Sequence, residues 1–113
     1  MRRLATYEDF LALDIRTGRV LSATPLEHAR SPAYRMEIDF GPQVGVKKSS
    51  ARITGLYTAA TLVGRLIVAV VNFPPKRVAG FESEVLVLGV PLPSGEVVLL
   101  APDRPVPPGQ RVF

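Results

Sequence analysis

The chain has 113 residues, 47% of them hydrophobic, which is enough for one globular domain and too few for two. It has no Cys, no Trp and a single His, which excludes disulfides and thiolate metal sites and favours a binding protein over an enzyme. The formal net charge of +4 favours polyanionic partners such as nucleic acid, although charge alone does not select one.

Nothing in the sequence predicts a membrane segment or a signal peptide. The longest uninterrupted apolar stretch, Leu66 to Val71, has six residues, far fewer than a bilayer span requires. Acidic residues at Glu8, Asp9 and Asp14 interrupt the N-terminal region, so it contains no apolar core of a signal peptide. We therefore expect a cytoplasmic protein that does not insert into membranes.

The first predicted elements are a short helix and a strand. Thr6 is suited to cap a helix from Tyr7 to about Leu13, because its hydroxyl can accept from the Asp9 N–H. A helix this short is unstable alone, so its apolar face must pack against another surface. The next element, residues 15–23, is expected to be a strand with a bulge or bend at Gly18.

Residues 34–40 are the clearest strand in the sequence. Apolar residues at 34, 36, 38 and 40 alternate with charged residues at 35, 37 and 39, which predicts one buried face and one solvated face. Residues 25–32 form a polar connection before this strand. Gly41-Pro42 ends it, and extended chain is expected to resume over residues 44–48 after a tight turn.

The second half predicts one helix among strands. Thr58 and Gly64 carry the signals for the start and end of a helix. The apolar runs 66–71 and 85–90 are typical of strands buried on both faces, and 96–101 is a further strand. The proline-rich tail, 102–113, is expected to be extended and held by Val112 and Phe113.

This order of elements predicts an all-β fold. Five or more strands, with one helix between the third and fourth, match the oligonucleotide/oligosaccharide-binding (OB) barrel, here with a short N-terminal helix and a C-terminal extension. The whole chain, 1–113, is then a single domain. A small sandwich of another kind would give much the same pattern.

No residue pattern predicts catalysis, a metal or a cofactor. His28 lies in a polar loop with no nucleophile at a useful spacing, so a surface role is the better interpretation. Glu37 and Asp39 share a strand face, but no third oxygen-rich position accompanies them, and hard cations require six or more oxygens.

Two basic loop segments are the candidate binding residues. Lysines and serines at 47–50, with Arg52, can neutralise and orient phosphate, although an ordinary exposed turn would look the same. In the segment 72–77, Asn72 suits a base edge and Phe73 a base face, but Phe73 could instead cap the core. We expect both segments to lie on one surface and to bind folded RNA.

Several longer motifs resemble the CsaA family. The resemblance covers nearly the whole chain from about Thr6 to Phe113 and is carried by residues 14–20, 32–34, 38–41, 47–51, 70–76, 83–89 and 102–107. It implies an OB barrel related to the tRNA-binding domains of aminoacyl-tRNA synthetases. It also implies a homodimer formed by the extensions 1–13 and 102–113, and an export-related molecular chaperone for unfolded or precursor polypeptides.

The resemblance also implies the tRNA-binding positions. These are Lys47, Lys48, Ser49, Ser50, Arg52, Asn72, Lys76 and Ser83. Arginine at 52, 65 and 77 departs from the lysine or neutral residue expected in the family, which keeps the charge and changes the phosphate geometry.

Two functions stay open at this stage. The first is a chaperone that also binds tRNA and holds polypeptide in an apolar groove lined by Phe73, Pro74, Val78 and Phe81. The alternative is a pure structure-specific tRNA-binding module with no chaperone role. Apolar residues in both extensions favour a second subunit as their cover, and folding of the termini over their own barrel is the other possibility.

Overall fold

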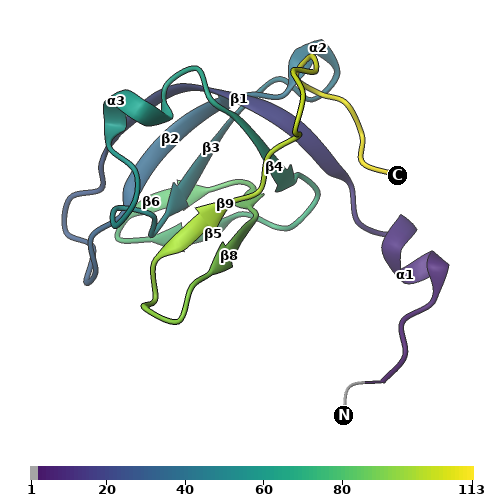
Figure 1. Cartoon of the computed structure of the whole chain (residues 1–113), viewed down its shortest axis with the longest axis horizontal. Coiled ribbons are helices and arrows are strands. Elements are labelled where there is room, and N and C mark those ends of the chain that lie inside the picture. The colour runs from purple at the N-terminus through teal and green to yellow at the C-terminus, as the bar shows by residue number, and fades with distance from the viewer. Residues whose placement is uncertain (1–2) are drawn as a thin grey trace.

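The computed structural model describes residues 3–113 and shows a nearly closed five-stranded antiparallel barrel (Figure 1). Residues 1–2 of the predicted N-terminal extension lie outside the described residues. The barrel strands, in their spatial order, are β3 (Val46–Ala51), β2 (Tyr34–Asp39), β1 (Ile15–Pro25), β4 (Leu66–Val70) and β7 (Leu86–Val87). The predicted all-β OB-like barrel is confirmed.

Within residues 3–113, two hairpins and three short helices complete the fold. One hairpin pairs β5 (Lys76–Val78) with β6 (Phe81–Ser83), and the other pairs β8 (Gly89–Pro91) with β9 (Val97–Leu99). The helices are α1 (Tyr7–Leu11), α2 (Gly41–Val44) and α3 (Ala59–Leu62). The short α2 replaces the simple turn expected after β2.

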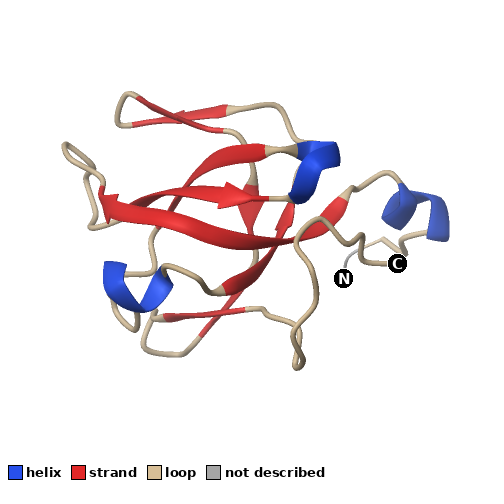
Figure 2. Cartoon of the chain, turned by 90° about the horizontal axis from the view of Figure 1, so that it is seen from above, coloured by secondary structure: helices blue, strands red, loops and turns tan. Residues whose placement is uncertain are grey.

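Helix α1 begins with the predicted cap but does not pack on the barrel. The Thr6 hydroxyl accepts from the Asp9 N–H at 3.2 Å, and the Asp9 carboxylate accepts from the Thr6 N–H at 2.8 Å. The helix ends at Leu11, two residues earlier than expected, and buries none of its side chains. It stands away from the barrel on the same side as the C-terminal tail (Figures 1 and 2).

The prediction of a bulge at Gly18 is wrong. Strand β1 is bulged between Val20 and Ser22, whereas Gly18 pairs regularly with Ile67 of β4. A Cβ at Gly18 would lie 2.6 Å from a ring carbon of Phe40. Glycine therefore makes room here for the core and does not bend the strand.

The core follows the predicted alternation of β2. Met36, Ile38 and Phe40 are each at most 1% exposed, and they pack with Leu62 of α3 and Ile67 of β4. Helix α3 has its expected cap, because the Thr58 hydroxyl accepts from the Thr61 N–H at 3.2 Å. Local capping and side-chain period were sufficient to predict these elements.

Two predictions in the second half of the chain are wrong. Residues 85–90 are not one doubly buried strand: the chain divides between β7 and β8, and Leu86 and Val90 are each 49% exposed. The division falls at Leu88, whose N–H donates to β4 and whose carbonyl accepts from Leu100. The β5–β6 hairpin was not expected, because the prolines before it indicated a loop; it turns at Ala79 and Gly80, both with positive φ.

The C-terminal tail is held by Thr17 of β1. The Thr17 hydroxyl donates to the Pro107 carbonyl and accepts from the Gln110 N–H, each at 3.0 Å. The Val112 N–H donates to the Ile15 carbonyl at 2.8 Å, but Phe113 is fully exposed, so the expectation that Phe113 anchors the tail is wrong.

Over residues 3–113, no helix is long and apolar enough to span a bilayer.

Candidate nucleic-acid interface

A groove of about 1260 Å³ lies between the loop 26–33, which joins β1 to β2, and the β5–β6 hairpin. Its floor is formed by the end of β3 and by residues 85–87. In OB barrels, the loop joining the first two strands and the loop joining the last two border the ligand site. The groove therefore occupies the place where this fold binds oligonucleotides.

Four cationic side chains line this groove and come from three separate elements. Arg30 comes from the loop 26–33, Arg52 follows β3, and Lys76 and Arg77 lie on β5. The carboxylate among the lining residues is Glu84. Positive charge therefore predominates around the groove and suits an anionic ligand.

The groove also has an apolar part. Phe73 (41% exposed), Pro74 and Val78 line it, together with Ile53 and Val85 on its floor. Three of the four residues expected to hold polypeptide thus lie beside the cations expected to hold tRNA. The groove therefore brings together parts of the two predicted sites.

A second hollow, of about 360 Å³, contains Lys48 and Phe81. The Lys48 ammonium lies 5.7 Å from the centroid of the Phe81 ring and forms a cation–π contact with it. Phe81 does not line the main groove, contrary to expectation. Lys47 lies next to Lys48 on β3, and neighbouring strand residues point to opposite faces of a sheet. The predicted surface at 47–50 is therefore divided between different places.

The hydroxyls of Ser49 and Ser83 form hydrogen bonds between β3 and the segment 83–85. Ser49 has no exposed surface, and its hydroxyl donates to the Val85 carbonyl at 3.2 Å. Ser83 is 9% exposed, and its hydroxyl accepts from the Ser50 N–H at 3.0 Å. The assignment of Ser49 to tRNA is corrected, because its side chain is shielded from phosphate. Ser83 lines the groove, and its assignment stays a prediction.

The side-chain amide of Asn72 also forms hydrogen bonds within the protein. Its side-chain oxygen accepts from the Asp14 N–H at 2.8 Å, and its side-chain nitrogen donates to the Ala12 carbonyl at 2.9 Å. Both ends of the amide therefore hold the segment that joins α1 to β1. These contacts favour a structural role for Asn72 over contact with a base edge, which stays a prediction.

Sequence reasoning noted Arg77 as a cation of the segment 72–77 without assigning it to tRNA, and it missed Arg30. Arg77 follows Lys76 on β5, and its guanidinium also donates to the Gly80 carbonyl at 3.2 Å. Arg30 lies in a loop that looked only polar, and the known position of this loop in OB barrels was the signal that could have found it. His28 lines the same groove.

The groove offers both positive charge and apolar surface to a ligand. In the part of the chain that is described, no three His, Cys, Asp or Glu residues cluster so that they could hold a metal ion. Every buried side-chain nitrogen or oxygen in that part has a hydrogen-bond partner. These features suit binding of a ligand.

Comparison with known proteins agrees with this description. Residues 15–111 match the family model described as "Putative tRNA binding domain". The crystal structure of the chaperone CsaA from Bacillus anthracis is 55% identical, with a TM-score of 0.93, and the match covers 98% of this chain and 100% of that one. The CsaA chaperone protein from Picrophilus torridus is 45% identical, with a TM-score of 0.91, over 97% and 100% of the two chains.

A longer enzyme also contains a related segment. The methionine–tRNA ligase of Methanosarcina acetivorans is 35% identical over 106 residues, which is 94% of this chain and 15% of the ligase. The chain therefore spans only a small part of that relative. Together, the barrel, the family match and the similarity over full length show that the chain belongs to the tRNA-binding-domain family and, within it, to the CsaA family.

Proposed function

We propose that this protein is a non-catalytic binding protein that holds tRNA in the groove between the loop 26–33 and the β5–β6 hairpin. The observation that carries the proposal is the convergence of Arg30, Arg52, Lys76 and Arg77 around one groove. Guanidinium groups bind phosphate oxygens in a bidentate manner, and the lysine adds a point charge. The exposed ring of Phe73 offers a stacking surface for an unpaired base.

We propose a second ligand for the same groove, namely unfolded or precursor polypeptide. The apolar surface of Phe73, Pro74 and Val78 supports this, because a ligand held by charge alone would not require it. The similar proteins from Bacillus anthracis and Picrophilus torridus are named chaperones. The physiological role would then be that of a cytoplasmic chaperone in protein export, with a pure tRNA-binding module as the alternative.

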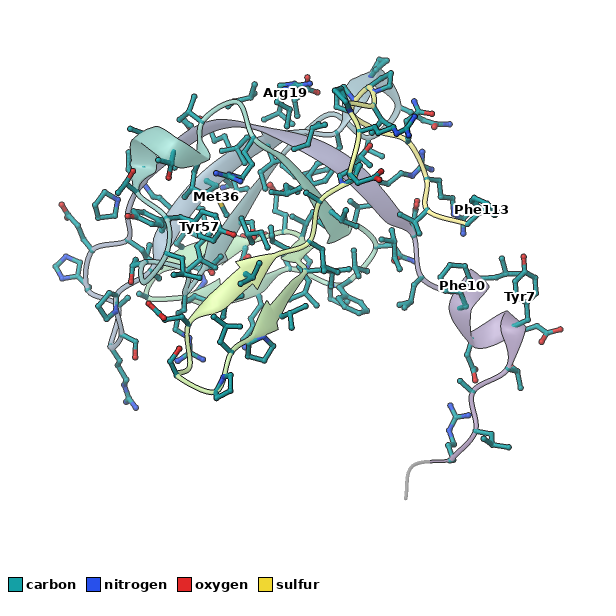
Figure 3. All side chains as sticks on the ribbon, viewed as in Figure 1. Tyr7, Phe10, Arg19, Met36, Tyr57 and Phe113 are labelled. Carbon is teal, nitrogen blue, oxygen red and sulfur yellow. The ribbon has the colours of Figure 1, made fainter. Side chains whose placement is uncertain are left out.

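We further propose that two copies form a homodimer through the extensions 1–13 and 102–113. Leu4 is 90% exposed, Tyr7 is 68% exposed and Phe113 is fully exposed. Tyr7, Phe10 and Phe113 all lie on the side of the molecule where α1 leaves the barrel (Figure 3). A twofold contact on this side would cover these apolar groups and supply two grooves to one large RNA.

The test of tRNA binding is a filter-binding titration with total tRNA at increasing NaCl. We expect log K to fall linearly with log[salt], with a slope of roughly −0.7 to −0.9 per phosphate contacted. Binding that is insensitive to salt, or absent, would remove tRNA from the proposal. Suppression of the aggregation of an unfolded protein, measured in parallel, decides between the chaperone and the pure tRNA-binding module.

A further inference from the structure

The barrel has an incomplete seam where its two edge strands meet. In a fully closed barrel, β3 and β7 would be joined by a main-chain ladder. Within residues 3–113, one main-chain hydrogen bond crosses this seam, from the Glu84 N–H to the Lys48 carbonyl at 2.8 Å. Glu84 precedes β7, so β7 itself forms no ladder with β3.

The other contacts across the seam are hydrogen bonds in which one partner is a side chain. The Lys48 N–H donates to the Glu84 carboxylate at 2.9 Å, and the Ser50 N–H donates to the Ser83 hydroxyl at 3.0 Å. The Ser49 hydroxyl donates to the Val85 carbonyl at 3.2 Å. All of these contacts lie at or before Ser50 on β3.

Beyond Ser50, the seam opens into the groove. Residues 51–53 on one side and residues 85–87 on the other both line the groove, and no main-chain hydrogen bond joins them in the described chain. Lys48 and Ser50 direct their N–H groups toward the seam, and Arg52, the residue that follows the end of β3, lines the groove. Over residues 3–113, Arg52 has no main-chain hydrogen-bond partner.

This open edge is suited to accept another strand. Exposed strand edges pair readily with extended chain unless proline or lysine blocks them. The edge of β5, which also lines the groove, follows Pro75 and carries Lys76, so it is guarded in this way. The edge beyond Ser50 has no proline and no lysine; it carries one charged residue, Arg52, and lines the same groove as the apolar residues Val85 and Val87.

We propose that the groove takes up an extended polypeptide segment as an additional strand along the end of β3, at Ser50 and Ala51, and along Arg52, which follows it. This inference rests on the polypeptide binding proposed above and specifies how it occurs. The main chain of the segment pairs with β3, and its side chains alternate between the apolar floor and the cationic rim. Arg30, Arg52, Lys76 and Arg77 oppose only Glu84 in the groove, so the preferred segment alternates apolar residues with carboxylates.

The test uses a fluorescein-labelled peptide of alternating valine and glutamate and two versions of it with methylated main-chain nitrogens. One version is methylated at every valine and the other at every glutamate, so that each loses the N–H groups of one edge. We expect one version to bind at least about tenfold more weakly than the parent peptide in fluorescence anisotropy, and the other to bind nearly as well. Equal binding or equal loss would overturn strand addition while leaving polypeptide binding in place.

A pair of variants tests the same edge from the protein side. Arg52→Ala removes the charge and keeps the main-chain N–H, whereas Arg52→Pro removes both. Strand addition predicts that Arg52→Pro weakens the parent peptide several-fold more than Arg52→Ala, in samples with the same circular dichroism spectrum. Equal effects of the two substitutions would contradict it. If the parent peptide does not bind while tRNA does, polypeptide binding and strand addition both fail and tRNA binding stands.

Discussion

The side-chain oxygen of Asn72 accepts a hydrogen bond from the main-chain N–H of Asp14 at 2.8 Å, across 58 positions of the sequence. The same amide donates to the Ala12 carbonyl, and Asn72 immediately precedes the groove residues Phe73 and Pro74. One side chain therefore joins the start of the groove loop to the end of α1. Its role is to position the projecting helix.

Replacing Asn72 should destabilise the fold without removing an RNA contact. Asn72→Ala loses two hydrogen bonds, so we expect the free energy of unfolding in urea to fall by about 1–2 kcal/mol. Thr54→Ala is the control, because Thr54 is exposed and its side chain forms no hydrogen bond in the described structure. A change in the salt dependence of tRNA binding by Asn72→Ala would return this residue to the interface.

Removing groove cations should reduce the salt dependence of tRNA binding. We expect Arg52→Ala and Lys76→Ala each to lower the steepness of log K against log[salt] by about 0.7–0.9, because each removes a phosphate contact. Arg104→Ala changes the net charge equally at a residue that does not line the groove. Equal effects of all three substitutions would show that only the total charge matters.

Polar substitutions on α1 should separate a homodimer. Leu11→Ser and Leu56→Ser are a matched pair, because both side chains are 46% exposed and only Leu11 lies on α1. We expect sedimentation equilibrium to give a mass near 12.3 kDa for Leu11→Ser and twice that value for Leu56→Ser. The proposed interface would be wrong if both variants kept the larger mass, or if the unaltered protein had the smaller one.

Adding a methyl group at Gly18 should strain the core. A Cβ there would lie 2.6 Å from Phe40 and 2.7 Å from Ile38, so we expect Gly18→Ala to lower the free energy of unfolding by about 1–3 kcal/mol. Gly55→Ala is the comparison, since its Cβ would meet only the movable side chain of Glu96 at 3.0 Å. Chemical denaturation of both variants measures the difference, and similar midpoints would disprove the packing role of Gly18.

The cap of α1 should weaken in acid. The Thr6 main-chain N–H and then the Arg3 guanidinium lower the pKa of Asp9 below its ordinary value of 3.8. A carboxyl with a lowered pKa in the folded state stabilises that state above the unfolded value, and this contribution is lost as the pH falls through the folded pKa. NMR shifts of the Thr6 amide, followed from about pH 6 to about pH 2, should report this loss. Asp9→Asn should remove the transition, and its persistence would assign it to another group.

The elements that depend on neighbouring residues could be predicted from the sequence. The Thr6 and Thr58 caps and the alternation along β2 each depend on residues within a few positions, and all three were found. The choice of barrel followed from the order of these elements. The position of the bulge in β1 was missed because Gly18 serves contacts with Phe40 that a local pattern does not contain.

The site was predicted only in part, because distant pairings decide which polar groups remain free. Ser49 and Ser50 look alike in sequence, but Ser49 is buried against Val85, 36 positions away, while Ser50 lines the groove. Asn72 looked like a free amide until its partners before β1 were known. Arg52 and Lys76 were both expected on the RNA-binding surface, and both line the groove; that they bind RNA stays a prediction.

The serine hydrogen bonds between β3 and the segment 83–85 have a consequence for how this barrel can change over generations. Every amino acid except proline supplies the same main-chain carbonyl and N–H to a ladder, so most substitutions leave those hydrogen bonds in place. The hydrogen bonds of the Ser49 and Ser83 hydroxyls depend on the side chain. A single substitution, for example to alanine or threonine, can therefore weaken or strengthen them. Single substitutions at these serines can therefore change the stability of the contact between β3 and the segment 83–85 in small steps.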